Sequence, residues 1–186
     1  MRFMFKIRTM IFSALLVFLI AGCNPVTTLY PLGAPLIPED KDNFEGSWLK
    51  DNDSVISIRF TSNGVGHIAA PFWENDQFRL VQMELIVTKN KDKKFISVRI
   101  KERETWDNYY YFAQYDFSDK GELILWEPNI EAFEAAIKTR NLEGVDKNSG
   151  INITNPPGVL LKFLNDNDNQ TLFKYRNPIV LRKIGK

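Results

Sequence analysis

The sequence contains one cysteine, Cys23, and one histidine, His67, and these side chains are the first candidates for nucleophilic or metal chemistry. A catalytic thiol is usually activated by a nearby histidine, but His67 comes 44 residues after Cys23, in a strand-like segment. A metal site needs several ligands, and neither residue has a second of its kind with which to share an ion. We therefore predict no catalytic residue, no metal site and no cofactor.

Carboxylates offer a second kind of chemistry. Glu102, Glu104 and Asp107 lie close together ahead of an aromatic segment, and paired carboxylates can act as general acid and general base in hydrolysis. The sequence does not fix the distances between these groups, and a charged loop is the simpler interpretation. The chain has no nucleophile-elbow, P-loop or dinucleotide-binding motif. An envelope hydrolase using clustered carboxylates stays an alternative hypothesis.

Aromatic side chains are the candidates for a binding surface. Tyr109, Tyr110 and Tyr111 follow one another in a strand-like segment, where successive side chains point to opposite faces. At least one of them must then point away from the core. With Trp73 and Trp126 they either pack beneath the helices on the outer face or line an apolar cavity or a groove for a ligand or a partner protein.

The residues ahead of Cys23 suggest a different use for its thiol. Arg2, Lys6 and Arg8 precede an uncharged apolar run at residues 9–22, which is the pattern of an export signal. That run has 14 residues, whereas a helix needs about 20 to cross a bilayer. A cleaved signal is therefore expected instead of a permanent membrane span.

The five residues LIAGC at 19–23 resemble the lipobox of bacterial lipoproteins. The resemblance implies that the signal peptide, residues 1–22, is removed and that Cys23 carries acyl chains, two or three of which make the attachment to membrane lipid effectively permanent. Asn24 stands where an aspartate would retain such a protein in the inner membrane. The expected location is the cell envelope, at the periplasmic face of the outer membrane if the organism has one.

Size and charge limit what the mature chain can do. Loss of the leader leaves 164 residues with 21 basic and 23 acidic side chains, a net charge of −2. This length suits one domain, and the near-neutral balance predicts no nucleic-acid partner. With Cys23 acylated, no internal disulfide is possible, so the core alone must stabilise the fold.

The arrangement of the chain predicts a tether followed by one β-rich domain. Four prolines among residues 24–43 favour a semi-stiff tether, so that residues 23–43 would carry the lipidated cysteine and a spacer, although the apolar Leu32 and its neighbours could instead lie on the domain. Residues 44–186 show short apolar runs separated by turn residues, which is typical of an antiparallel meander or barrel.

Two helices interrupt this β pattern. Apolar residues recur at helical spacing in residues 128–141 and 154–168. Residues 150–154 are expected to form a short strand between them, and residues 171–175 and 178–184 two further strands. The fold class is therefore mainly β with two helices inserted before the last strands.

Gly46 and Trp48 form a G-x-W motif on the first expected strand, and Arg182 lies on the last. This resembles the calycin, or lipocalin-like, arrangement, which implies that the three residues close one end of a barrel by stacking a guanidinium on an indole. Residues 133–164 also resemble a group of uncharacterised bacterial lipoproteins, which implies a shared fold and no known activity.

Together these observations predict a membrane-anchored envelope lipoprotein. Its domain is expected to act as a non-enzymatic binding or accessory module whose partner is an apolar ligand or an envelope protein. The alternatives are the hydrolase described above and a structural subunit of an envelope complex.

Replacing Cys23 by serine tests the predicted anchor. We expect the Cys23→Ser protein to lose palmitate labelling and to keep its unprocessed size, because the acylated thiol directs both anchoring and cleavage. Labelling with palmitate measures the acylation, electrophoretic mobility measures the size, and membrane fractionation measures the attachment. A Cys23→Ser protein that runs at mature size and still sediments with membranes would contradict the lipoprotein prediction.

Overall fold

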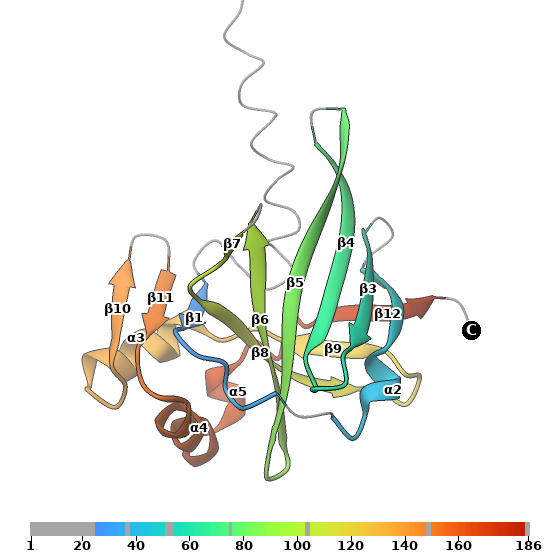
Figure 1. Ribbon diagram of the computed structural model, residues 1–186. Coiled ribbons are helices and arrows are strands. Elements are labelled where there is room, and N and C mark those ends of the chain that lie inside the picture. The colour runs from blue at the N-terminus through green and yellow to red at the C-terminus, as the bar shows by residue number, and fades with distance from the viewer. Residues whose placement is uncertain are drawn as a thin grey trace, which may run out of the picture.

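The computed structural model describes residues 25–184, apart from residues 36–37, 51–53, 75, 103–104 and 148–149 (Figure 1). Cys23, the signal peptide at 1–22 and Glu104 therefore lie outside the described residues. No helix in the described part of the chain has both the length and the apolar character that a membrane crossing requires.

Eight antiparallel strands form a closed barrel (Figure 1). In their order around the barrel they are β8 (Tyr110–Phe117), β9 (Leu123–Trp126), β12 (Ile179–Ile184), β2 (Gly46–Lys50), β3 (Ser54–Phe60), β4 (Gly66–Glu74), β5 (Gln77–Asn90) and β6 (Lys93–Glu102). The pairing of β6 with β8 closes the ring. The short strand β7 (Thr105–Trp106) pairs with the end of β6 and is not part of the ring. The predicted mainly β, lipocalin-like antiparallel barrel is confirmed.

Strand alternation fills the inside of this barrel. On β6, Ile96, Val98 and Ile100 point inward, where they join a core that includes Trp48 and the fully buried Phe44 from the short helix α2 (Lys41–Phe44). The space left among these side chains is an apolar cavity of about 30 Å³, room for about one water-sized sphere. Around these described side chains, the barrel interior is therefore a packed core without room for the ligand of a lipocalin-type central pocket.

A second apolar core lies on the outer side of β6 and β8. Phe95 and Phe112 point outward from these strands and pack with Phe133 and Phe173. The elements around this second core are β1 (Val26–Thr28), α3 (Ile130–Lys138), β11 (Gly150–Ile153), α4 (Pro157–Asp166) and α5 (Asn169–Leu172), with β10 (Gly144–Lys147) at the sheet edge. The two predicted helices are present as α3 and α4, and the predicted strand at 150–154 as β11.

The described part of residues 24–43 lies on the domain and does not form the predicted spacer. β1 pairs with both β8 and β11, and Leu32 is fully buried and donates its backbone N–H to Ser97 Oγ at 3.0 Å. The apolar residues between the prolines drive this packing, because their burial outweighs the preference of proline for an extended, solvated chain. The packed part of the domain therefore includes Pro25 and the described residues after it, in agreement with the alternative interpretation of this segment.

The predicted strand at residues 171–175 is wrong. The carboxylate of Asp168 accepts a hydrogen bond from Gln170 N and caps the short helix α5, which buries Leu172. Only Phe173 makes a strand-like contact, an isolated bridge with Pro128. A local cap and the second core thus override the β-like composition of this segment.

Gly150 permits Pro25, the residue before β1, to lie against the start of β11. It has φ +130°, and a β-carbon there would lie 2.3 Å from Pro25 O. Pro25 O also accepts the backbone N–H of Ile151 at 2.9 Å. A side chain at position 150 would therefore push the start of the chain away from β11.

We expect Gly150→Ala to destabilise the protein by at least about 3 kcal/mol, since it combines backbone strain with a main-chain clash. Gly121→Ala is the matched control, because Gly121 has φ +75° but no atom within 4 Å of its would-be β-carbon. It should cost only about 1–2 kcal/mol. Urea unfolding measures both changes, and equal losses would contradict the steric role of Gly150.

Candidate functional site

A groove of about 570 Å³ opens at the end of the barrel where β5 turns into β6. One wall is the segment before β2, and the other consists of the ends of β5, β6 and β8. Its lining includes Gly33, Ala34, Pro38, Glu39 and Asp40 on the first wall and Val87, Lys89, Lys94 and Tyr115 on the second. The groove thus exists because residues 33–34 and 38–43 pack against the barrel end.

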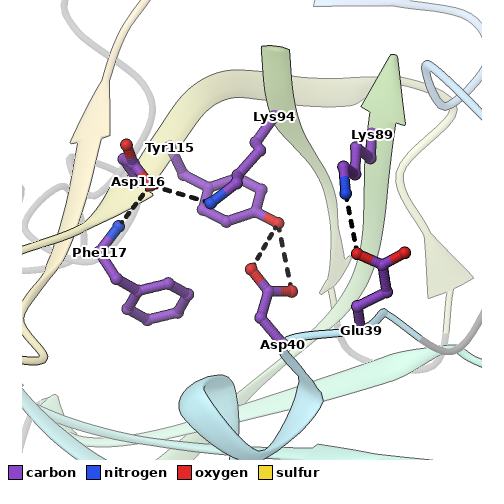
Figure 2. A network of polar contacts seen from close by, with 7 residues as sticks. All are labelled: Glu39, Asp40, Lys89, Lys94, Tyr115, Asp116 and Phe117. Carbon is purple, nitrogen blue, oxygen red and sulfur yellow. Dashed lines mark hydrogen bonds and ion pairs between the residues drawn. The ribbon is translucent and has the colours of Figure 1, made fainter. Parts of the chain in front are cut away.

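Tyr115 joins the two walls. Its ring is buried in the barrel core against Phe44, with ring centroids 5.0 Å apart, and its hydroxyl donates to Asp40 Oδ2 at 3.2 Å (Figure 2). Burial raises the pKa of this phenol far above its ordinary value, and the negative charge of Asp40 adds to the effect. Tyr115 is therefore a neutral hydrogen-bond donor that fixes Asp40 at the start of α2.

Two lysines flank the tyrosine. The ammonium of Lys94 lies 3.0 Å from Asp116 Oδ1 and 5.9 Å from the centre of the Tyr115 ring. Lys89 Nζ lies 2.8 Å from Glu39 Oε2 on the opposite wall, and this hydrogen bond and its charge attraction lower the pKa of Glu39 and raise that of Lys89 (Figure 2). Both partners of the Lys89–Glu39 pair are exposed, so water screens it and a ligand can replace either partner at small cost.

The two walls touch most closely between Gly33 and Thr88. A β-carbon on Gly33 would lie 2.7 Å from Thr88 Oγ1, so only glycine permits this approach. Within the described residues, this buried hydroxyl has no hydrogen-bond partner. The groove wall therefore holds one polar group whose bonding capacity is unused.

The predicted barrel-closure residues lie on two neighbouring strands of the barrel, Gly46 and Trp48 on β2 and Arg182 on β12. Trp48 is fully buried and donates its indole N–H to Phe44 O at 2.7 Å. The cation over its ring is Lys183, at 5.4 Å, and not the predicted Arg182, which is exposed and pairs with Glu122 at 3.2 Å. The register explains the difference, because Trp48 pairs with Lys183 across β2 and β12, so Arg182 points to the opposite face.

Gly46 has a role in the same contact. Its φ is +132°, and a β-carbon there would lie 2.9 Å from Lys183 Cε. The glycine of the G-x-W motif therefore makes room for the lysine stem that covers Trp48. Lys183 Nζ also donates to the backbone carbonyls of Asp42 and Asn43, which connects α2 to the last strand.

The aromatic residues predicted to form one binding surface lie in separate contacts. Tyr110 is buried beside Arg99, whose guanidinium lies 5.0 Å from the Tyr110 ring and 5.1 Å from that of Trp106. Trp126 stacks on Tyr175 at 4.9 Å, at the edge of the second core. Tyr110 and Trp126 thus take part in two separate packing contacts.

Two of the remaining predicted aromatics have described side chains. Tyr109 and Tyr111 are partly buried, and Tyr111 packs against the barrel core. Trp73 lies on β4 opposite Phe78, and its side chain is not among those described.

The other candidate groups also lie apart from the groove. His67 is exposed on β4, opposite Arg59 on β3 and Glu84 on β5. Asp107 follows β7 and donates its backbone N–H to Ile100 O at 2.9 Å. No group of three or more metal-binding side chains occurs among the residues that the structure describes.

Sequence reasoning did not identify the groove residues as a site. Lys89 and Lys94 are visible in the sequence as part of a lysine-rich hairpin turn, but their acidic partners lie 50 residues before and 22 residues after them. The packing of residues 38–40 at the barrel end brings Glu39 to Lys89, whereas Lys94 meets Asp116 because β6 pairs with β8.

Comparison with protein-family models, with curated proteins and with solved structures finds no match for this chain.

Tyr115→Phe tests the link between the two walls. We expect a loss of about 1–2 kcal/mol at neutral pH, because Asp40 loses a buried donor. Above pH 10.0, the ordinary pKa of a phenol, the unfolded wild-type protein releases a proton that the folded protein keeps. Wild-type stability should therefore fall by an additional 1.4 kcal/mol or so per pH unit relative to Tyr115→Phe.

Urea unfolding from pH 7 to pH 11 measures this difference. Tyr30→Phe is the control for removal of a phenol hydroxyl, because Tyr30 is 53% exposed and the bond from Tyr115 to Asp40 stays in place. A stability gap between wild type and Tyr115→Phe that stays constant up to pH 11 would show that the buried phenol does not resist ionisation.

Proposed function

We propose that this protein is a membrane-anchored envelope lipoprotein whose domain binds a ligand or a short segment of a partner protein in the groove at the barrel end. The lipobox-like sequence around Cys23 supports the anchor. The observation that carries the binding role is the groove of about 570 Å³ beside a barrel whose interior holds a cavity of only about 30 Å³. A groove of this volume falls within the range of small-molecule sites.

The lining of the groove indicates the chemistry of its ligand. Ala34 and Pro38 provide accessible apolar contact area, whereas Lys89, Lys94 and Glu39 place both signs of charge near it. A site with balanced charges suits a compact ligand with an apolar body and polar or oppositely charged ends. A short peptide segment of an envelope protein has this character, and its charged groups could take the place of Glu39 on Lys89.

The same geometry disfavours the hydrolase alternative. Glu39 and Asp40 are the carboxylates that line the groove, but neither is arranged as a general acid. An ion pair with Lys89 lowers the pKa of Glu39, and Asp40 accepts a hydrogen bond from Tyr115. A catalytic acid usually needs a raised pKa, produced by burial or by a second carboxylate. Binding without chemistry therefore explains the site better.

Filling the groove tests the proposal. Ala34 is an exposed residue of the groove wall, so Ala34→Trp should fill the space without disturbing the core. Ala135→Trp is the matched control, because Ala135 is exposed on α3, away from the groove lining. Native mass spectrometry of the lipoprotein purified from its own envelope would show any bound ligand or partner.

We expect a co-purifying molecule on the wild-type protein and on Ala135→Trp, and its loss from Ala34→Trp. A bound molecule that Ala34→Trp retains would contradict the groove as the site. A wild-type protein that carries no molecule, but assembles through a broad surface, would favour the structural-subunit alternative.

A further inference from the structure

The hairpin of β4 and β5 projects beyond the rest of the barrel (Figure 1). All the side chains at residues 76–80 are exposed, and they include the two most exposed large apolar residues of the β5 strand, Phe78 at 61% and Leu80 at 50%. Exposed apolar side chains on a projecting element are unfavourable in water. The tip therefore has the properties of a contact surface.

Phe78 and Leu80 belong to one face of the hairpin. They are two residues apart on β5, so both point to the same side of the strand. Across the pair they face Trp73 and Pro71 of β4, and Asp76 is in the connecting turn. The apolar face is thus short, narrow and placed at the end of a two-stranded ribbon.

The start of the domain limits how far it can lie from the proposed anchor. Pro25 is held in place by the hydrogen bond from Ile151 N and by its contact with Gly150. Only Asn24 stands between Pro25 and Cys23. Two residues span at most about 7 Å, so an acylated Cys23 would hold the domain directly against the bilayer.

The side of the domain next to the anchor is also defined. Gly150 begins β11, so the start of β11 lies beside Pro25. Figure 1 shows that the end of β10 and the start of β11 lie toward the same side of the molecule as the projecting ends of β4 and β5, whereas α4 lies at the opposite end. A domain that rests on the bilayer near Pro25 therefore directs the hairpin tip toward the lipid.

We propose that the β4–β5 tip inserts Phe78 and Leu80 into the interfacial region of the same bilayer that holds Cys23. This inference rests on the proposed lipid anchor. The tip carries Glu74 and Asp76 and a single basic residue, Arg79, so attraction to anionic headgroups cannot drive the contact. Burial of the apolar side chains drives it instead, and the contact should persist at high salt.

Fluorescence quenching of the full lipoprotein in vesicles of phosphatidylethanolamine and brominated phosphatidylcholine tests the inference. Acylation occupies Cys23, the only cysteine, so Gln77→Cys provides a single free thiol at the tip for a polarity-sensitive dye while Phe78 and Leu80 stay in place. Val159→Cys is the control, because Val159 is 46% exposed on α4, at the opposite end of the molecule.

We expect the dye at position 77 to show a blue-shifted emission that brominated lipid quenches at low and high salt, and the dye at position 159 to show neither effect. Adding Phe78→Asp and Leu80→Asp should abolish the quenching at position 77 while the protein still floats with the vesicles.

The outcomes separate the anchor from the insertion. A protein that does not float with vesicles would overturn the lipid anchor and this inference together. A protein that floats but keeps its tip dye in water would overturn the insertion alone. Quenching that survives Phe78→Asp and Leu80→Asp would show that these side chains do not make the contact.

Discussion

The structure depends on the burial of both faces of β6 and β8. Ile96 and Val98 point into the barrel, while Phe95 and Phe112 point out into a second core. A strand of a soluble barrel usually has one solvated face, so these two strands require cover on the outside. The helices and the segment that begins at Pro25 provide this cover, and the rest of the molecule is arranged around it.

The candidate site is a consequence of this cover. The chain from β1 crosses the outer face of the barrel, where Leu32 bonds to Ser97 and Gly33 lies against Thr88, and then reaches the barrel end at Asp40. There it forms the second wall of the groove. Because the described side chains fill the interior of the barrel, the lipocalin-like fold leaves no central pocket among them. The groove lies at the barrel end instead.

The same cover changes the expected relation between domain and membrane. A tether of about twenty proline-rich residues would hold the domain some 60 Å from a bilayer, whereas the incorporation of Pro25 and Val26 into the sheet leaves one residue after Cys23. The acyl chains would then restrict the orientation of the domain as well as its location. With such an anchor, the projecting apolar hairpin would lie within reach of the lipid surface.

The sequence by itself determined the class of the fold, because the alternation of side chains on β6 and the helical spacing in α3 and α4 are local patterns. It also led to the prediction of an envelope location, since the signal-like run and the lipobox-like residues are contiguous. Tertiary structure alone decided that Lys183 and not Arg182 covers Trp48, because a shift of one residue moves a side chain to the other face. It likewise decided that Glu39 meets Lys89 and that Asp40 meets Tyr115, since these pairs are distant in the sequence and only the packing of an apolar segment onto the barrel brings them together.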